Sequence, residues 1–496
     1  MTITELVEQH LAIAQADTCN AFAALSASQA LADAAVLDRL PPGERGPLHG
    51  LPVTIKDLFN VYGLPTVAGT RASLPALWPP EAAAVTRLRA AGAVVIGKTN
   101  MHEIALGITG ENPWTGDVRN PIDPARMSGG SSSGSAAAVR MGAGVVSLGT
   151  DTAGSIRLPA SFCGVVGFRP THGRVPLTGA LALSPSLDTA GPLARTVEDA
   201  RRVAEVLLGT PLRVAAPSNP LFGTALPYLE GRLSQGVRQA FLALLAGLRV
   251  KEVAFPVLED ASRLQIEVGW PESAQIHETS LNALLRGEPS VPPHASLSVG
   301  SLATSHPSPG STAPTLPGTS ALSRPSPVSE TLAFPRTPAP SGPSPASGTP
   351  APSQGHMPSP ETTGGFSPVI LEALLRGRDV SPEVRQSAAE QRRQLTATLN
   401  EALREVDALI MPAAPVVAPP RGTTHIDLES GPALLRPSLL TLLVPFSMAG
   451  LPVASVPFCE IDGLPVNVQI ITRRGEDALC LALAEWFESH VSPARH

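Results

Sequence analysis

The sequence predicts an α/β protein. Segments with the alternation or apolar character of strands interchange with segments in which apolar residues recur at helical spacing, which is the order typical of this class. Of the 496 residues, 43% are hydrophobic and 16% are charged, a balance that supplies a sizeable core. The length corresponds to roughly three average domains or to one large α/β domain.

The first half of the chain supplies most of this alternation. Residues 3–40 are alanine-rich and are expected to form two helices, ended by Pro41, Pro42 and Gly43. Residues 51–56 alternate as a strand does, with Leu51, Val53 and Ile55 on one side and Thr54 and Lys56 on the other. The remaining expected elements here are helices at 81–91, 135–141 and 196–208, the last with Thr196 as its cap, and strands at 94–96 and 144–149.

The second half predicts a long amphipathic helix at 382–406 and strands at 408–411, 454–458 and 466–471. Residues 439–458 form an uncharged run long enough to raise the question of a membrane span. Because the run contains Pro445, Pro452 and Pro457, we expect a loop followed by a buried strand, and no membrane partner. The N-terminus has no basic segment followed by an apolar one, so we expect no signal peptide and a cytoplasmic location.

Residues 289–360 differ in composition from the rest of the chain. They hold about a third of the 53 prolines, mixed with Ser, Thr, Ala and Gly, and only Arg324, Glu330 and Arg336 are charged. Such a segment buries too little apolar surface to offset its ordering entropy. We therefore expect a disordered insertion over 286–366, between the two parts of one discontinuous domain, 1–285 and 367–490.

Charge and cysteine usage exclude several function classes. The net charge is −6 and no basic run occurs, which argues against direct nucleic-acid binding. The four cysteines are widely scattered at Cys19, Cys163, Cys459 and Cys480. They show neither a disulfide framework nor a metal-ligand spacing, which indicates a reducing compartment and predicts no metal and no cofactor.

Lysine is scarce in this chain. Only Lys56, Lys98 and Lys251 occur among 36 cationic residues, so arginine is used almost wherever a plain positive charge is needed. A lysine retained in such a chain is a candidate for a task that requires loss of the proton, although chance retention explains any one of the three equally well.

The run at residues 128–135 (SGGSSSGS), which leads into an alanine-rich helix, allows three interpretations. A flexible linker would not normally be flanked tightly by a helix and a strand. A phosphate cradle of the Walker type would end in Gly-Lys-Ser/Thr, and no lysine is present. A G-x-S-x-G nucleophile elbow would place Ser132 as nucleophile, but the two prolines in 120–127 do not suit the strand that should precede it.

The segment at residues 149–160 (GTDTAGSIRLPA) follows the strand expected at 144–149. A tight turn with several free main-chain N–H groups can stabilise an oxyanion, and the Ser155 hydroxyl would lie beside them. The alternative is an ordinary turn with a capping serine.

Together these segments resemble the amidase signature family of serine hydrolases. The resemblance covers nearly the whole chain except residues 285–366 and rests on residues 50–57 (GLPVTIKD), 96–100 (IGKTN), 129–135 (GGSSSGS), 151–157 (DTAGSIR), 162–171 (FCGVVGFRPT), 186–192 (SLDTAGP), 450–457 (GLPVASVP) and 463–469 (GLPVNVQ).

The resemblance implies one large domain with a central mixed β-sheet covered by helices on both faces. It also implies a Ser–cis-Ser–Lys triad with Ser155 as nucleophile, Ser131 as the bridging cis serine and Lys56 as base. The implied oxyanion hole consists of the N–H groups of Thr152, Ala153, Gly154 and Ser155, with supporting roles for Ser132, Asp151 and Arg157. Burial must lower the pKa of a lysine base from about 10.4 for this chemistry to work near neutral pH.

The chain departs from the family pattern in places. Ala153-Gly154 stands where Gly-Gly is usual before the nucleophile, Asn467 stands where glycine is frequent, and Ser447-Met448 replaces Asn-Leu or Asn-Thr.

The expected activity is hydrolysis of a small-molecule amide to an acid and ammonia, and a homodimer is compatible with the sequence. Three alternatives remain: the glutaminase subunit of a tRNA-dependent amidotransferase, an α/β-hydrolase acting on esters through Ser132, and a non-catalytic relative with a Pro-rich interaction arm. Residues 186–192 resemble general amidases more than that glutaminase subunit.

Overall fold

A mixed sheet of eleven strands forms the centre of the fold in the computed structural model, which describes residues 1–255, 261–286 and 365–491. The sheet order is β1-β3-β2-β4-β6-β5-β12-β13-β9-β7-β8, and β10 and β11 form a separate hairpin. The strands are β1 (Phe22–Leu25), β2 (Pro52–Lys56), β3 (Val94–Thr99), β4 (Val146–Asp151), β5 (Val166–Arg169), β6 (Thr189–Ala194), β7 (Leu221–Thr224), β8 (Arg249–Glu252), β9 (Ala408–Pro412), β10 (His425–Leu428), β11 (Gly431–Leu434), β12 (Val453–Ile461) and β13 (Leu464–Ile471).

Helices connect these strands along the whole chain. The α-helices are α1 (Ile3–Gln15), α2 (Ala27–Leu37), α3 (Ala83–Ala90), α4 (Ser133–Met141), α5 (Arg157–Cys163), α6 (Val197–Leu208), α7 (Leu226–Leu229), α8 (Gln235–Ala246), α9 (Ala261–Ile276), α10 (Glu278–Leu285), α11 (Pro368–Arg378), α12 (Pro382–Ala402), α13 (Leu435–Thr441), α14 (Val444–Met448) and α15 (Asp477–His490), with 3₁₀ turns η1 (Pro42–Glu44) and η2 (Glu103–Ala105).

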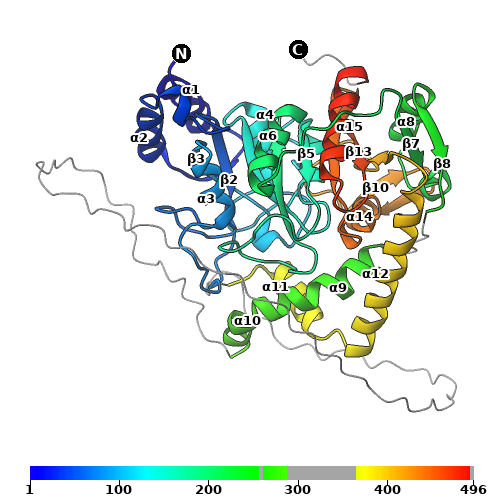
Figure 1. Cartoon of the computed structure of the whole chain (residues 1–496). Helices are drawn as coiled ribbons and strands as arrows, with labels where there is room; N and C mark the ends of the chain where they lie inside the picture. Colours follow the sequence, from blue (N-terminus) through cyan, green and yellow to red (C-terminus); the bar gives the residue numbers. More distant parts are fainter. Residues whose placement is uncertain (256–260, 287–364, 492–496) are drawn as a thin grey trace, which may run out of the picture. The chain divides into compact units, whose positions relative to one another are not determined.

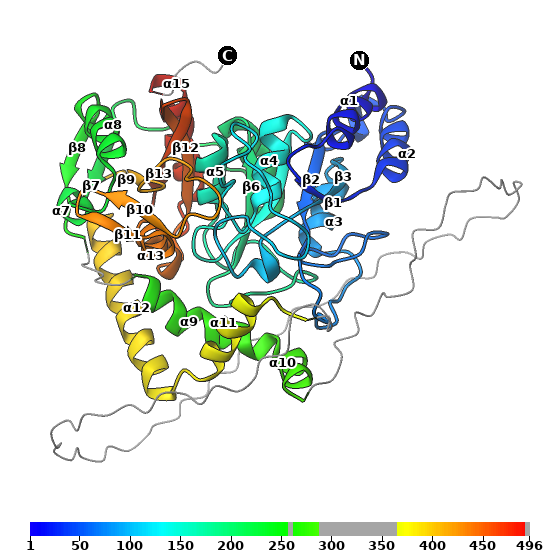
Figure 2. The same ribbon diagram turned by 180° about the vertical axis from the view of Figure 1, so that it is seen from behind.

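Helices cover both faces of the sheet. In β6, Leu193 packs in a cluster with Ala136 of α4 and Ala160 of α5, whereas the neighbouring Ala194 belongs to the cluster that contains Val203 of α6. Successive strand residues point to opposite faces, so α4 with α5 and α6 lie on opposite sides. Figures 1 and 2 show α9, α11 and α12 gathered in another group beyond the sheet, where α11 and α12 both pack against α9.

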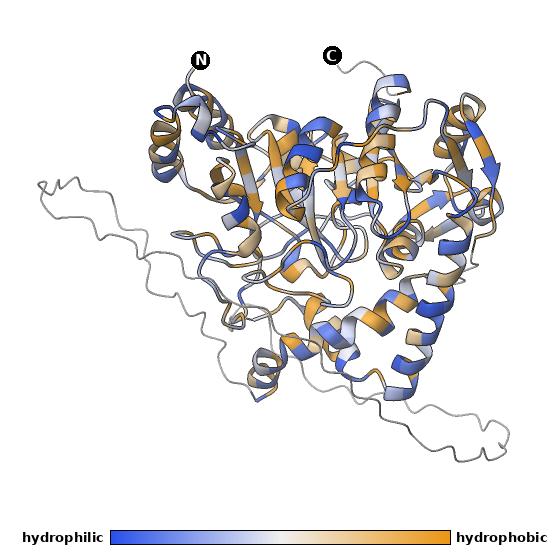
Figure 3. Cartoon of the chain, viewed as in Figure 1, coloured by the Kyte–Doolittle hydropathy of each residue, from blue (hydrophilic) through white to orange (hydrophobic). Residues whose placement is uncertain are grey.

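Hydropathy follows this layering. Figure 3 shows hydrophobic residues concentrated in the central strands and hydrophilic residues along α12 and at β8. Strand β8 lies at the edge of the sheet, and all four of its residues are exposed. Its charged residues Arg249, Lys251 and Glu252 discourage pairing with a further strand.

Most of the elements expected from the sequence are present. The strands β2, β3, β4, β9, β12 and β13 and the helices α3, α4, α6 and α12 occupy the expected segments, within a few residues at their ends. Thr196 caps α6 as expected, because its side chain accepts a hydrogen bond from the Asp199 N–H. The expected insertion at 286–366 falls almost entirely outside the described residues.

Two expectations about local structure were wrong. Residues 3–40 hold the strand β1 between α1 and α2, because residues 22–25 pair antiparallel with β3 at the edge of the sheet. Residues 439–458 begin with helical turns rather than a loop, since α13 ends at Thr441 and α14 spans Val444–Met448 before β12 begins. In the described part of the chain, no helix is long and apolar enough to cross a membrane.

The sheet brings three chain segments to one edge. Strand β2 pairs in parallel with β3 on one side and with β4 on the other. The carboxyl ends of parallel strands meet at the same edge, so Lys56 at the end of β2 lies beside Thr99 of β3 and close to the last residues of β4. This edge holds the residues that the sequence singled out.

Candidate active site

The end of β2 and two loops meet where β2 and β4 end. Lys56 is the last residue of β2, Ser131 lies in the loop that precedes α4, and Ser155 lies in the turn between β4 and α5. All three residues are buried. The structure therefore brings together the three segments that the sequence proposed as one site.

Lys56 is the centre of this arrangement. Its Nζ donates hydrogen bonds to Ser131 Oγ and to Thr150 Oγ1, each at 2.8 Å. Burial lowers the pKa of Lys56 to about 7, and the charges of Asp188 and Asp151 offset only part of that effect. A lysine with this pKa is substantially neutral at physiological pH and can accept a proton.

The other two lysines have different surroundings. Lys98 is buried in an ion pair with Asp57, with Nζ and Oδ1 2.7 Å apart, and also donates to the Pro65 carbonyl and to Thr66. Lys251 lies at the surface, 2.6 Å from Glu405. Lys98 and Lys251 each have a carboxylate partner. In the described structure, the amine of Lys56 has only hydroxyl partners.

Ser131 is held from both sides of its peptide unit. The Gly130–Ser131 peptide bond is cis, as the resemblance implied. The Ser131 carbonyl accepts a hydrogen bond from the His102 N–H at 3.2 Å, while its hydroxyl accepts from Lys56. These contacts fix the hydroxyl beside the amine.

The neighbouring Ser132 hydroxyl is engaged elsewhere. It donates to the Thr150 carbonyl at 3.1 Å and accepts from the Thr150 N–H at 3.3 Å. Ser132 thus ties the serine-rich loop to β4, and this engagement disfavours its use as a nucleophile. Its main-chain N–H also donates to the Ser155 carbonyl at 3.2 Å, which joins the two serine-bearing loops directly.

Ser155 is 4% exposed in the turn that follows β4. No hydrogen bond links the Ser131 and Ser155 hydroxyls anywhere in the described residues, and Ser155 is joined to the serine-rich loop through its carbonyl, which accepts from the Ser132 N–H. Catalytic hydrogen bonds are often longer or poorly aligned without substrate and shorten when substrate binds. The role of Ser155 as nucleophile remains a prediction.

The turn before Ser155 presents N–H groups in two different ways. The Gly154 N–H donates to Asp151 Oδ1 at 2.9 Å, and the Ile156 N–H donates to Asp151 Oδ2 at 3.2 Å. Within the described structure, the N–H groups of Thr152, Ala153 and Ser155 donate to no other residue, so these three are available to an oxyanion. The Gly154 N–H, which donates to Asp151, therefore stabilises the shape of the turn.

Asp151 organises this turn together with two buried arginines. Its carboxylate lies 3.0 Å from Nε of Arg157 and 3.0 Å from Nη1 of Arg169. Burial opposes ionisation of Asp151, but the two guanidinium groups outweigh it and hold the pKa of this carboxyl far below its usual range. Because all of these side chains are buried, the turn is fixed by charge-assisted hydrogen bonds.

Arg157 extends this network to the C-terminal part of the chain. Its guanidinium donates to the Leu443 carbonyl at 3.0 Å, to Ser447 Oγ at 2.6 Å and to Gln469 Oε1 at 2.8 Å. Ser447 is one of the positions at which the sequence departs from the family pattern. Its hydroxyl serves as an acceptor for Arg157, so the turn that carries Ser155 is anchored to α14.

Sequence reasoning missed three residues of this site. Thr150 is a second partner of the Lys56 amine. Asp188 accepts from Thr152 Oγ1 at 2.6 Å and lies close enough to Lys56 to raise its pKa. Thr150 lies in the segment 149–160 and Asp188 in the motif 186–192, so these motifs could have indicated both residues. His102 contacts the Ser131 carbonyl through its main chain, a contact that no side-chain pattern could indicate.

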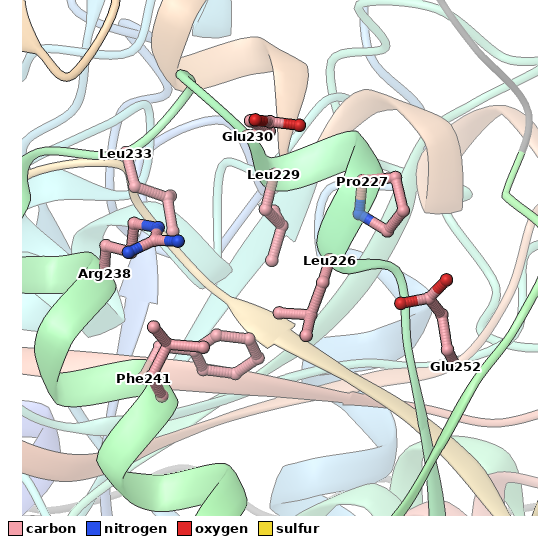
Figure 4. Close-up of a pocket in the computed structure, with 9 residues that line it drawn as sticks. Leu226, Pro227, Leu229, Glu230, Leu233, Arg238, Phe241 and Glu252 are labelled. Carbon is pink, nitrogen blue, oxygen red and sulfur yellow. The ribbon is translucent and has the colours of Figure 1, made fainter.

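The cavities of the structure differ in their relation to this site. A small one of about 10 Å³ is lined by Thr150, Thr152 and Asp188 together with residues 177 and 180–183. A larger one of about 280 Å³ lies at the opposite end of the sheet near β8, between α7 and α8 (Figure 4). Leu226, Leu229 and Phe241 point into it with Glu230, Arg238 and Glu252 around them, and none of the candidate site residues lines it. We therefore do not place the reaction in the larger cavity.

The described residues hold no group of three or more His, Cys, Asp or Glu side chains that could bind a metal ion.

Comparison with known proteins identifies one matching family. The family model described as Amidase matches residues 5–228 and 365–481. The chain is 32% identical over 501 residues to the A-type subunit of the glutamyl-tRNA(Gln) amidotransferase of Symbiobacterium thermophilum, a match that covers 98% of this chain and 92% of that protein. The match to the same-named protein of Koribacter versatilis is 43% over 262 residues and spans only about half of each chain, 48% of this one and 54% of the other.

Solved structures show the same likeness. A crystal structure described as an amidase superimposes with a TM-score of 0.81 at 42% identity and covers 99% of this chain and 97% of the other. The A-type subunit of the glutamyl-tRNA(Gln) amidotransferase of Thermotoga maritima superimposes with a TM-score of 0.64 at 25% identity, covering 100% and 96%.

Proposed function

Because this chain belongs to the amidase signature family, we propose that it hydrolyses a carboxamide C–N bond to a carboxylic acid and ammonia through an acyl-enzyme on Ser155. The observation that supports this most strongly is the buried Lys56 amine, whose pKa is lowered to about 7 and which lies 2.8 Å from the Ser131 hydroxyl.

The first half of the reaction forms the acyl-enzyme. The neutral Lys56 amine takes the proton of the Ser131 hydroxyl while Ser131 takes the proton of Ser155, and Ser155 Oγ attacks the amide carbon. The carbonyl oxygen becomes an oxyanion that accepts hydrogen bonds from the N–H groups of the turn. The proton held by Lys56 returns through Ser131 to the amide nitrogen, the C–N bond breaks, and ammonia leaves.

The second half releases the acid. Water attacks the Ser155 ester carbon while its proton passes to Ser131 and the Ser131 proton passes to Lys56. The second tetrahedral species then collapses, the bond between the acyl carbon and Ser155 Oγ breaks, and the proton returns from Lys56 through Ser131 to Ser155 Oγ. The same lysine acts as base and then as acid in each half. Arginine cannot perform this cycle because its guanidinium stays protonated at any pH at which proteins are stable.

One alternative is favoured by a specific observation. The relatives at 32% identity over nearly the whole chain are named as A-type subunits of an amidotransferase, which supports glutamine hydrolysis by the same site chemistry. The difference would lie in where the ammonia goes and in a partner protein that receives it. The motif at 186–192 and the 42% identity to a structure described as an amidase support the stand-alone enzyme.

The other two alternatives have less support. Ester hydrolysis through Ser132 would need a free Ser132 hydroxyl and a histidine base. That hydroxyl donates to the Thr150 carbonyl and accepts from the Thr150 N–H. A non-catalytic role gives no reason for a buried lysine amine to have two hydroxyl partners and no carboxylate partner.

Ammonia release from a panel of simple amides tests the proposal. The purified chain alone should release ammonia from at least one aliphatic or aryl carboxamide, and Ser155→Ala should abolish that release. Hydrolysis of glutamine alone, and only after a partner protein is added, would instead favour the amidotransferase alternative. Undiminished ammonia release by Ser155→Ala would contradict the mechanism.

A further inference from the structure

Arg436, on the first turn of α13, is a half-buried cation without an acidic partner in the described structure. Its side chain makes a long hydrogen bond from Nη2 to Gln265 Oε1 at 3.4 Å, and its Nε is buried with no acceptor in the described part of the chain. Burial lowers the pKa of Arg436 to about 10, so the guanidinium is still protonated at neutral pH. A polar group withdrawn from water normally has a hydrogen-bond partner, and the Nε–H of this half-buried cation has none among the described residues.

Trp270 of α9 lies directly against this guanidinium. The Arg436 Cζ is 5.3 Å from the centroid of the Trp270 ring, and Trp270 is only 6% exposed. The indole Nε1–H is also buried with no acceptor in the described part of the chain. Both groups can only donate hydrogen bonds, so Arg436 and Trp270 form a pair of adjacent donors, which we call the Arg436–Trp270 pair.

The Arg436–Trp270 pair is connected to the turn that carries Ser155. Helix α13 leads into Leu443, whose carbonyl accepts from Arg157, and the Leu443 side chain packs directly over Gly154. On the other side, Gly269 of α9 faces Ser184 and Leu187, in the loop that ends at Asp188. The segment after α13 therefore borders the turn of Ser155, and α9 borders the loop that ends at Asp188.

His102 links the pair to the base. Its main-chain N–H donates to the Ser131 carbonyl at 3.2 Å. Burial lowers the pKa of the His102 imidazole to about 3, and the charges of Arg436 and Lys56 both contribute. The imidazole is therefore neutral near physiological pH and adds no positive charge beside Arg436.

We propose that Arg436 and Trp270 bind a carboxylate on the substrate, so that the substrate is an amide that also carries a carboxylate, such as the monoamide of a dicarboxylic acid. The inference rests on the proposed function and narrows its substrate class. A carboxylate supplies acceptors for both buried donors and the counter-charge that Arg436 lacks.

The surroundings of Arg436 favour a purely anionic amide over a zwitterionic one. The Arg436 guanidinium makes no ion pair with an Asp or Glu side chain of the described residues, and its one side-chain hydrogen bond goes to the neutral amide of Gln265. An α-ammonium group beside the bound carboxylate, as in glutamine, would therefore meet the positive charge of Arg436 with no acidic side chain nearby to compensate.

Matched substrates test this assignment. Ammonia release is measured with the monoamides of succinic and glutaric acid, with the same monoamides in which the free carboxylate is converted to a methyl ester, and with glutamine. The wild type should prefer a monoamide to its ester by about 10- to 100-fold in kcat/KM, the value of a charged hydrogen-bonded contact. Arg436→Gln should remove this preference, mainly through KM, while leaving the ester substrate within about threefold.

Two further variants test the role of the indole N–H and control for the loss of an arginine. Trp270→Phe keeps the ring under the guanidinium but removes the indole N–H, and should weaken only the anionic substrates by about 3- to 10-fold. The matched control is Arg376→Gln, an exposed arginine in an ion pair with Glu372, which should change neither substrate. Equal losses on monoamide and ester in Arg436→Gln would overturn the assignment and indicate a structural role.

A binding measurement separates this inference from the proposed function. Calorimetry with glutarate and with its neutral diamide needs no turnover. If glutarate binds the wild type and not Arg436→Gln, the carboxylate site stands even if no amide is hydrolysed, in which case the proposed function fails alone. If glutarate binds no better than the diamide, the carboxylate site is wrong even if simple amides are hydrolysed.

Discussion

The Nζ atom of Lys56 lies 2.8 Å from the Oγ atom of Ser131, and both side chains are fully buried. The other partner of the amine is the Thr150 hydroxyl, and the described residues place no carboxylate within ion-pair distance of it. Hydroxyl groups compensate a buried ammonium far less than a carboxylate does, so the neutral amine is favoured. This is the electrostatic condition that a lysine base requires.

Replacement of Lys56 by arginine should abolish turnover although it keeps a cation. We expect a loss of about 10²- to 10⁴-fold in kcat, the contribution of a general base. The matched control is Lys251→Arg, because Lys251 is exposed and paired with Glu405, and this variant should retain wild-type kcat. Steady-state ammonia release measures both, and near-normal turnover in Lys56→Arg would remove Lys56 from the mechanism.

The rate of acyl-enzyme formation should rise with pH through a midpoint near 7. The folded-state pKa of Lys56 is lowered to about 7, so the amine is protonated and inactive below this pH and neutral above it. The rate at which a fluorophosphonate labels Ser155, measured from pH 5 to pH 9, follows this titration directly. A rate that falls across this range would mean that the protonated lysine is the active form.

Gly154→Ala should impair catalysis through the shape of the turn. Gly154 has φ of 121°, and a Cβ atom there would lie 2.5 Å from Leu443 Cδ1. We expect about a 10²-fold loss of kcat, comparable to loss of one oxyanion donor, and a loss of about 1–3 kcal/mol in the free energy of unfolding. The control is Gly173→Ala, at φ of 83° with no atom within 4 Å, which should show the backbone cost without the loss of kcat.

Replacement of residues 289–360 by a short Gly/Ser linker should leave a folded and active protein. The composition of this segment contributes little to a core. The described ends approach each other, because a Cβ on Gly365 would be 3.1 Å from Leu284 Cδ2. We expect a melting temperature within about 3 °C of the full chain, since a shorter loop changes the closure entropy only slightly. A drop of about 10 °C or more would show that the segment stabilises the fold.

Local patterns indicated the segments of the site but not the roles of its residues. Lysine scarcity singled out Lys56, Lys98 and Lys251 equally, and the glycine- and serine-rich run by itself pointed to Ser132. The triad of Ser155, Ser131 and Lys56 was implied by the family resemblance. The strand β2 was evident from its alternation, although the sequence did not show that both of its faces are buried.

Other features depend on tertiary contacts that no local pattern reveals. The short strand β1 exists because it pairs with β3, and its four residues are too few to stand out between two alanine-rich helices. Ser447 contacts Arg157 across 290 positions of sequence. Arg436 stands as a single cation among leucines, and its lack of a carboxylate partner becomes visible only when the chain is folded.

The most direct test of the Ser–Ser–Lys mechanism is the position of a fluorophosphonate adduct, mapped by peptide mass spectrometry in the wild type and in Lys56→Ala. We predict an adduct on Ser155 that is lost or greatly slowed in Lys56→Ala. An adduct on Ser132, or labelling of Ser155 that is unaffected by the loss of Lys56, would contradict this mechanism.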